Sequence, residues 1–409
     1  MDGEELIEYA DSGFRAGLLD EPGVLLVERP DAVPRLNVVL PHYSASMAYG
    51  GIVSALELAR AASTHYSQVR FVSQRPWAMT TDPVELGAYV ADPAGTLIET
   101  ADFAPRAGEA SGLVCHQRDI FFCTFWTTVL VWEAHAAALL ATGRRPNPFY
   151  YFIQDFEPGF YPLSYKYYRA VQTYAHAEAY AIYNSRELAA FFRGQGYGFG
   201  REAVLMPSLN PALHAHLASQ RFRLAPKPTD RVVILVYGRP AQARNCFPEI
   251  LEGLYCFFSA LPPSERARFM VVSAGAAAPH ADIRLFPELL VKCAGKLPIE
   301  KYIAYLGFAH IGISLMASPH PSYPPLEMAA FGLYTITNRF ANKDLSAAHP
   351  NIRSIDAPWP RTLAAALHAA VAWLATPTAS ARRAVLPTNM SPLPWRENVA
   401  ALKIEMIGG

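Results

Sequence analysis

The stretch that decides the fold is Val232-Val233-Ile234-Leu235-Val236-Tyr237-Gly238-Arg239-Pro240. Its first six residues form an uninterrupted apolar run rich in β-branched side chains, which is typical of a strand buried on both faces of a parallel sheet. The run follows a proline-rich segment, 208–230, that indicates an interdomain linker. It therefore predicts the first strand of a second domain.

On both sides of this stretch, short apolar runs alternate with helical patterns. After it, strands are expected at 269–273, 290–293, 311–315 and 335–337, and helices at 247–260, 299–306, 325–331 and 361–375. Before it, strands are expected at 36–40, 69–73, 113–116, 120–125, 150–154, 181–183 and 204–206, and helices at 51–65, 126–141, 163–176 and 186–194. Such alternation predicts an α/β fold of parallel strands with helices on both faces.

The alternation predicts two Rossmann-like domains that face each other across a cleft, where ligands would meet the carboxyl ends of the strands. A C-terminal helical pattern at 394–407 is expected to cross back onto the first domain. The predicted parts are an N-terminal extension (1–35), a first domain (36–207), a linker (208–230), a second domain (231–385) and a crossing segment (386–409).

Composition excludes several classes of protein. The 409 residues include 35 basic and 35 acidic side chains, with 52% apolar and 17% charged residues. A disordered chain needs low hydrophobicity, and a nucleic-acid binder normally carries a basic excess, so neither is expected. No apolar run reaches the ~18 residues of a membrane span, and the acidic N-terminus lacks a secretory pattern, so a cytoplasmic location is expected.

Basic residues follow two predicted strands of the second domain. Gly238, Arg239 and Arg244 lie after the strand at 232–237, and Lys296 lies after the strand at 290–293. A guanidinium binds phosphate with two parallel hydrogen bonds and keeps its charge, which suits an anionic leaving group. The alternative is that these are solvated surface cations.

The most specific motif is residues 318–332, SPHPSYPPLEMAAFG, after the strand at 311–315. Pro324 and Pro325 suit a first helical turn but remove two N–H donors. A phosphate here would have to use the Ser322 hydroxyl, the N–H groups of Ser322 and Tyr323, and the helix dipole. Glu327, expected in the first turn, could accept hydrogen bonds from sugar hydroxyls. Alternatively, a stiffened loop and a dipole-compensating glutamate would explain Glu327 alone.

The first domain has two candidate motifs, one at the start of a predicted helix and one at the end of a predicted strand. Gly50 and Gly51 open a helix and would let a ligand approach the backbone, or would simply form a tight turn. Asp155, after the strand at 150–154, could orient or deprotonate an acceptor hydroxyl, or could cap the following turn. No Asp-x-Asp pair occurs in the sequence, and no metal site is predicted.

Together these motifs resemble the GT-B glycosyltransferases related to family 4, and most closely the WsaF-type rhamnosyltransferases of bacterial surface glycans. The resemblance covers roughly residues 36–375 and is densest at 231–345, where 318–332 is followed by Thr337-Asn338-Arg339 and Asn342-Lys343-Asp344. It implies that the second domain binds a nucleotide-sugar donor and the first domain binds a glycan acceptor. Broader family 4 enzymes carry a second glutamate eight residues before Glu327, where this chain has Pro319.

The resemblance assigns roles to the donor residues. It places Arg239 and Lys296 on the departing diphosphate and Glu327 on the ribose. Ser322 and Tyr323 would cradle a phosphate, and Arg244 is the nearest candidate for the second cation of the 238–245 loop.

For the first domain, the resemblance places Asp155 near the acceptor hydroxyl and Gly50-Gly51 under the reacting sugar. It further implies transfer of L-rhamnose from dTDP-L-rhamnose, without a metal or other cofactor and with retention of configuration. The acceptor would be a surface polysaccharide or O-antigen. A lipid-linked acceptor would be met at the inner face of the membrane by peripheral contact. Two alternatives stay open, namely a nucleotide-sugar epimerase and a non-catalytic glycan-binding relative.

Overall fold

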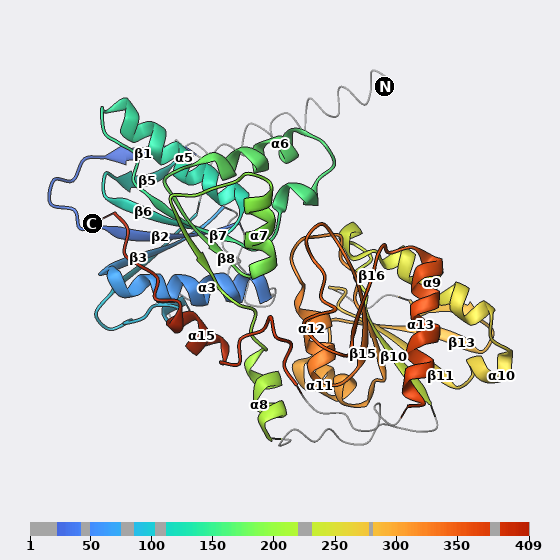
Figure 1. The fold of residues 1–409 in the computed structure, drawn as a ribbon. Coiled ribbons are helices and arrows are strands. Elements are labelled where there is room, and N and C mark those ends of the chain that lie inside the picture. The colour runs from blue at the N-terminus through green and yellow to red at the C-terminus, as the bar shows by residue number, and fades with distance from the viewer. Residues whose placement is uncertain are drawn as a thin grey trace. The chain divides into compact units, whose positions relative to one another are not determined.

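The computed structural model describes residues 23–41, 50–74, 86–102, 112–219, 231–277, 281–376 and 385–408. The chain divides into two compact units, each built on its own seven-stranded sheet (Figure 1). Unit 1 comprises Met1–Asn184, Phe192–Leu205 and Val399–Gly409, and unit 2 comprises Ser185–Phe191 and Met206–Asn398. The predicted two-domain α/β architecture is confirmed.

The main sheet of unit 1 has the strand order β4-β3-β2-β6-β7-β8-β9, and every pairing in it is parallel. The chain runs outward from β2 to β4 and then returns to the other side of β2, so the order reverses between β2 and β6. Such a switch point is where ligands bind in open α/β sheets. The strands are β2 (Arg35–Leu40), β3 (Gln68–Ser73), β4 (Leu97–Asp102), β6 (Asp119–Cys123), β7 (Phe149–Ile153), β8 (Ala179–Tyr183) and β9 (Arg201–Val204).

Unit 1 also has a two-stranded parallel ribbon, β1 (Val24–Val27) with β5 (Leu113–His116). The sequence predicted 113–116 as part of the main sheet, but the strand pairs with β1 instead. Helices α3, α5 and α6 belong to unit 1 together with this sheet. The residues of α7 are divided between the two units. The bounds of these helices are α3 (Gly50–Ala62), α5 (Trp126–Ala141), α6 (Tyr165–Gln172) and α7 (Arg186–Gly194), with 3-10 turns at Ser63–His65, Glu157–Phe160 and Thr173–Ala175.

The sheet of unit 2 has the order β12-β13-β11-β10-β14-β15-β16. All its pairings are parallel except that of the edge strand β12 with β13. The order reverses between β10 and β14, which is therefore the switch point of this unit. The strands are β10 (Val232–Tyr237), β11 (Phe269–Ala274), β12 (Ile283–Phe286), β13 (Leu289–Gly295), β14 (Ile311–Ile313), β15 (Tyr334–Asn338) and β16 (Ile352–Ile355).

Strand β10 lies in the centre of this sheet, and its side chains alternate between two apolar layers. Ile234 and Val236 pack with side chains of α9 and α13, whereas Val233 and Leu235 pack with side chains of α8, α11 and α12. An uninterrupted apolar run is required because both faces of the strand are covered. The helices are α8 (Pro211–Ser219), α9 (Phe247–Ser259), α10 (Pro263–Arg266), α11 (Ile299–Phe308), α12 (Tyr323–Ala330) and α13 (Pro360–Leu374), with a 3-10 turn at Ala243–Asn245.

After unit 2, the chain returns to unit 1. Helix α15 (Trp395–Ala401) spans the boundary, and the residues after it bond to side chains of unit 1. His65 Nε2 lies 2.8 Å from the carbonyl oxygen of Ile404, and the hydroxyls of Tyr66 and Tyr150 donate to the carbonyls of Ile407 and Glu405, each at 2.8 Å. The helix predicted at 394–407 therefore ends at Ala401, because the following carbonyls face side-chain donors instead of helical N–H groups.

Two further boundaries differ from the sequence prediction. The predicted strand at 204–206 lies at 201–204. The predicted linker 208–230 contains helix α8, whose Leu213 and Leu217 are buried in the core of unit 2, and residues 220–230 lie outside the described residues. In the described part of the chain, no helix combines the length and apolarity needed to cross a membrane.

Candidate functional site

The candidate site of unit 2 begins where β10 ends. The N–H of Gly238 donates to the carbonyl of Ala274 at 2.8 Å, and a Cβ at Gly238 would lie 2.7 Å from the ring of Phe247. Only glycine fits without moving its neighbours, because α9 approaches the backbone closely at this point. The next residue, Arg239, stands at the carboxyl edge of the sheet.

Arg239 is half-buried and lies over a second glycine. Its Cγ would be 3.6 Å from a Cβ at Gly275, whose φ of +115° also favours glycine. Within the described ranges, no carboxylate forms an ion pair with the Arg239 guanidinium. Its charge is thus available to an anion at this edge of the sheet.

Three loops converge around His320. The ring is 6% exposed, and its pKa is lowered to about 3 by burial and by the positive charges of Lys343 and Arg244. These two cations come from the loops after β15 and β10, and His320 comes from the loop after β14. The structure therefore gathers two cations around a neutral imidazole beside the switch point.

Lys343 was not predicted as a site residue. It is 1% exposed, and its Nζ donates to the carbonyl of Met316 at 2.6 Å. The sequence signal was the Asn342-Lys343-Asp344 string, which the family resemblance included without assigning it a role. Its burial depends on the fold of the loop after β15 and could not be read from the string.

Several buried polar atoms at this switch point have no hydrogen-bond partner among the described residues. They are Oγ of Ser314, Oδ1 of Asn245 and Nε2 of His320. Buried polar atoms are almost always paired in folded proteins, so three orphans beside two cations indicate a place for a polar ligand.

Ser322 precedes helix α12 in a strained conformation, with φ +67°. Its N–H donates to Nδ1 of His320 at 3.0 Å, and the N–H of His320 in turn donates to Oγ of Ser318 at 3.0 Å. In this structure the loop itself uses the Ser322 N–H, so its predicted contact with a phosphate stays a prediction. The predicted roles of the Ser322 hydroxyl and of Tyr323, whose ring packs 5.8 Å from that of His320, stay predictions.

Glu327 lies in the second turn of α12, one turn later than predicted, because the helix already begins at Tyr323. The Tyr302 hydroxyl of α11 donates to its Oε2 at 2.8 Å. Burial raises the pKa of Glu327 to about 7, although this hydrogen bond opposes the shift. The carboxyl is therefore held in one orientation, and its predicted contact with a ribose stays a prediction.

Lys296 follows β13 and is exposed. It stands at the same carboxyl edge as Arg239, but β11 separates β13 from β10 in the sheet. The structure thus brings Arg244 and Lys343 closer to the switch point than Lys296.

The candidate residues of unit 1 also lie at a carboxyl edge. Gly51 is in the first turn of α3, and a Cβ there would lie 2.8 Å from Oε1 of Gln154, which follows β7. Nε2 of Gln154 donates to the carbonyl of Thr124 after β6, at 3.2 Å. The helix start is therefore linked to the ends of two neighbouring strands. Gly50 is the first residue of α3, whereas residues 48 and 49 of the same motif lie outside the described residues.

Asp155 and Glu157 form a buried acidic pair after β7. Asp155 is 7% exposed, and its Oδ1 accepts from the N–H of Phe156 at 2.8 Å, which matches the capping alternative. Glu157 is 1% exposed and accepts from the N–H of Trp126, at the start of α5, at 2.7 Å. Burial, together with the charge of Asp155, holds the pKa of Glu157 well above its usual range. Glu157 is thus a helix cap that the sequence did not reveal.

The described residues contain no cluster of three or more His, Cys, Asp or Glu side chains arranged to hold a metal ion. Two Rossmann-type units, each with a switch point at the carboxyl edge of its own sheet, give the two-domain architecture of the GT-B fold. The chain matches the WsaF N-terminal domain over residues 35–186 and the WsaF C-terminal domain over residues 232–368. It belongs to the WsaF family.

A curated relative is the O-antigen biosynthesis protein RfbC of Myxococcus xanthus, which is 31% identical over 225 residues. The match covers 54% of this chain and 15% of that relative. The chain therefore spans a small part of the length of RfbC.

Solved structures share the fold. The glycosyltransferase WaaG, involved in lipopolysaccharide biosynthesis, is 12% identical with a TM-score of 0.51, covering 90% of this chain and 95% of WaaG. Anabaena HepE, solved with UDP and glucose, is 12% identical with a TM-score of 0.53, covering 91% of this chain and 95% of HepE. At such identities the likeness shows the GT-B fold alone.

Proposed function

We propose that this protein transfers a sugar from a nucleoside diphosphate donor to a hydroxyl group of a glycan, and that unit 2 holds the donor. The observation that carries the proposal is the group of cations and unpaired buried polar atoms beside the switch point between β10 and β14. A diphosphate supplies negative charge and acceptor oxygens for the Ser314 hydroxyl and for Nε2 of His320, whereas Oδ1 of Asn245 is an acceptor and would pair with a hydroxyl group of the donor.

The cations have distinct places in this proposal. Arg239, half-buried and without an ion-pair partner in the described ranges, forms the bidentate contact with the diphosphate. Arg244 and Lys343, whose positive charges both act on His320, offset further negative charge. Glu327, oriented by Tyr302, accepts hydrogen bonds from the ribose. Lys296 approaches the diphosphate from the end of β13.

The proposed reaction breaks the bond between the anomeric carbon and the diphosphate oxygen, and the acceptor oxygen bonds to that carbon. The leaving diphosphate gains negative charge as the sugar becomes oxocarbenium-like. Fixed cations aimed at the developing charge are worth about 3–4 kcal/mol per well-placed donor. In this proposal, the protein's own cations stabilise the leaving group without a metal ion, and configuration is retained.

We further propose that the acceptor is bound by unit 1. Asp155 and the Gly50-Gly51 start of α3 lie at the carboxyl edge of its sheet, where ligands of this fold bind. Asp155 would position the acceptor hydroxyl or take its proton. Glu157 is 1% exposed and accepts the N–H of Trp126, so Asp155 is the better candidate of the pair for this role.

The donor proposed is dTDP-L-rhamnose, because the motif at 318–332 resembles that of WsaF-type rhamnosyltransferases. The acceptor proposed is a surface polysaccharide or O-antigen, in line with the O-antigen biosynthesis protein RfbC. If that acceptor is lipid-linked, the protein would work in the cytoplasm at the inner face of the membrane. HepE, a GT-B protein solved with UDP-glucose, is the reason to test uridine nucleotides beside thymidine nucleotides.

The test measures transfer from a panel of nucleoside diphosphate sugars to a rhamnan-type acceptor. Arg239→Ala is expected to lower kcat/KM by roughly 10²–10³-fold, because it removes one donor to the developing charge. Arg361→Ala is the matched control, since Arg361 is exposed at the start of α13 and is expected to keep full activity.

Three outcomes would contradict the proposal. If Arg239→Ala transfers sugar as fast as the native protein, the diphosphate does not bind at this edge of the sheet. Conversion of the donor sugar without any acceptor product would indicate an epimerase. Tight glycan binding without turnover of any nucleotide sugar would indicate a non-catalytic relative.

A further inference from the structure

Unit 1 contains a cavity of about 360 Å³ that the transfer reaction does not use. Its walls come from the β1–β5 ribbon, from the amino-terminal halves of β2 and β3, and from the middle and second half of β4. Arg35 and Arg70 lie in the first halves of β2 and β3, whereas Gln154 and Asp155 follow the carboxyl end of β7. Its lining residues are Val27, Arg29, Arg35, Arg70, Glu99, Thr100, Ala101, Val114, Cys115 and His116.

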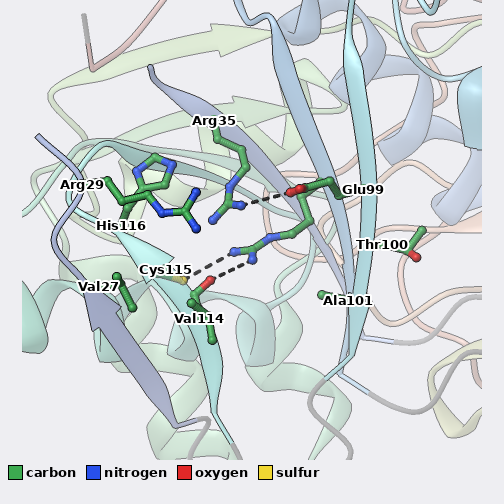
Figure 2. A pocket seen from close by; sticks show the side chains of 10 residues that line it. Val27, Arg29, Arg35, Glu99, Thr100, Ala101, Val114, Cys115 and His116 are labelled. Atoms are coloured by element: carbon green, nitrogen blue, oxygen red, sulfur yellow. Dashed lines mark hydrogen bonds and ion pairs between the residues drawn. The ribbon is translucent and has the colours of Figure 1, made fainter. Parts of the chain in front are cut away.

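Figure 2 shows how the charged side chains surround this space, with Arg29 and His116 on one side and Glu99 and Thr100 on the other. Val27 is 37% exposed and Val114 is 47% exposed, so the cavity opens to solvent beside the ribbon. Cysteine and valine side chains supply the apolar part of its wall.

The positive charges of this cavity exceed the negative charges. The carboxylates near the cavity are those of Asp119 and Glu99, and both pair mainly with Arg35. The Arg35 guanidinium donates twice to Asp119 at 2.8 Å and once to Glu99 at 3.0 Å. Asp119 is fully buried and also accepts the N–H of His116 at 2.9 Å. The nearest approach of Arg70 to Asp119 is 3.8 Å. Arg35 and Arg70 thus share two carboxylates, and Arg29 adds a third positive charge to the cavity.

Arg70 is 6% exposed and bonds chiefly to neutral acceptors. Its Nε donates to Asn37 at 2.7 Å, its Nη1 to the carbonyl of Val114 at 2.8 Å, and its Nη2 to the sulfur of Cys115 at 3.5 Å. Burial, with a further contribution from the charge of Arg35, lowers the pKa of Arg70. A buried guanidinium with so weak a counter-charge is stabilised when an anion enters.

Arg29 is the third arginine of the cavity and lies where the cavity opens to solvent. It is exposed, and in the described part of the chain its guanidinium has no hydrogen bond. Its charge reaches His116, whose pKa is lowered chiefly by burial and also by the three arginines, although the charge of Asp119 opposes the shift. Arg29 can therefore swing onto a bound anion without breaking another contact.

Glu99 narrows the choice of ligand. Its side chain is 41% exposed and lies beside Arg35 in the wall. A bare inorganic anion would be repelled by this carboxylate, whereas a ligand with hydroxyl groups can donate hydrogen bonds to it. The space is at the lower end of the range for small-molecule pockets, roughly 300–1,000 Å³.

We propose that this cavity binds a small anionic sugar, a monosaccharide unit whose carboxylate or phosphate group lies against Arg70 and Arg29 and whose hydroxyl groups face Glu99 and Thr100. The site is separate from the proposed donor site, which lies in unit 2. The ligand can come from a sugar phosphate or from a sugar acid, because both present the same anionic group and hydroxyls.

The test is calorimetric titration of the full chain with glucose 1-phosphate, glucuronic acid, glucose and inorganic phosphate. Binding of one equivalent of at least one anionic sugar is expected, with glucose and inorganic phosphate at least 10-fold weaker. The response to the first two ligands distinguishes a phosphate source from a carboxylate source. Failure of both to bind at millimolar concentration would overturn the proposal.

Variants locate the binding. Arg29→Ala is expected to weaken binding about 10-fold without unfolding the protein, because its side chain is exposed. The matched control is Arg118→Ala, an exposed arginine near the same ribbon whose guanidinium bonds to the carbonyl of Ala32 and which does not line the cavity. Equal loss in both variants would show a general charge effect and would overturn the proposal.

A second pair of variants separates this site from the donor site. Arg239→Ala is expected to leave binding of the anionic sugar unchanged, and excess dTDP is expected not to displace it. If Arg239→Ala abolishes binding and Arg29→Ala does not, the ligand occupies unit 2 and the cavity proposal fails while the proposed function stands.

Discussion

Glu327 shows how one side chain of a candidate site can lower the stability of the folded protein. Its carboxyl is oriented by Tyr302, and burial raises its pKa from 4.5 to about 7. Between these two values the unfolded chain is already ionised while the folded protein still holds the proton. The contribution of this residue to stability therefore falls as pH rises from 4.5 to 7, and it stays low above pH 7.

We expect Glu327→Gln to relieve this cost. The amide oxygen can still accept from Tyr302, but no charge has to be buried. The melting temperature of the variant, relative to that of the native chain, is expected to rise when pH is increased from 5 to 8. Thermal unfolding at pH 5, 6, 7 and 8 measures the difference. A difference that is constant over this range would contradict the raised pKa.

At the residue scale, the sequence predicted the charged groups better than it predicted their partners. Arg239 could be placed at a strand end because a glycine and a buried strand precede it. By contrast, the donation of the Ser322 N–H to His320 depends on a positive φ at Ser322, which nothing in the residue type suggests. The burial of Lys343 depends on a loop from another strand and was equally hidden.

Among the elements, helices α9 and α13 show how close packing limits substitution. A Cβ at Gly253 of α9 would lie 2.6 Å from Cδ2 and 2.9 Å from Cβ of Leu363 in α13. The Cβ of Leu363 is fixed by its helix, so the two helices would have to separate. The approach of these helices therefore requires glycine at 253.

We expect Gly253→Ala to destabilise unit 2 by about 1–3 kcal/mol, which is the usual cost of overpacking a core. Gly307→Ala in α11 is the matched control, because nothing lies within 4 Å of its added Cβ. There the gain in helix propensity is expected to stabilise by up to ~1 kcal/mol. Urea unfolding of both variants measures the change in the free energy of unfolding, which is expected to be negative for Gly253→Ala and positive for Gly307→Ala. Stabilisation by Gly253→Ala would show that the two helices can yield.

The elements that the sequence predicted well are the buried ones. The strand at Val232–Tyr237 and the helix at Trp126–Ala141 have the predicted bounds, because their apolar patterns are continuous over the whole element. The strands at Leu97–Asp102, Ile283–Phe286 and Ile352–Ile355 were missed. They mix charged with apolar residues and lie at the edges of their sheets, where only one neighbouring strand covers them.

For the whole molecule, the sequence repeated one strand–helix alternation on both sides of residues 208–230, and two α/β units follow from that repetition. The return of the chain to unit 1 was predicted, but not the way in which it is held. Its contacts are backbone carbonyls that accept from Tyr66 and Tyr150, and such contacts leave no pattern in the residues that supply the carbonyls.

Deleting residues 403–409 is expected to destabilise unit 1 and to leave unit 2 unchanged. The deletion removes the carbonyls of Ile404, Glu405 and Ile407. The hydroxyls of Tyr66 and Tyr150 then keep only their 3.3 Å contact with each other, so one donor is left unpaired at a cost of about 1–3 kcal/mol. Hydrogen exchange followed separately in β2 and β10 measures the two units. Equal protection of β2 in the shortened and full chains would contradict the prediction, and β10 is the internal control.

The returning segment also sets the order of events during synthesis. Unit 1 contains residues from both ends of the chain, with nearly all of unit 2 threaded between Leu205 and Val399. A ribosome has therefore released the whole of unit 2 before the last partners of Tyr66 and Tyr150 emerge. Unit 2 can therefore fold first, whereas unit 1 can form its last hydrogen bonds only after synthesis of the C-terminal segment.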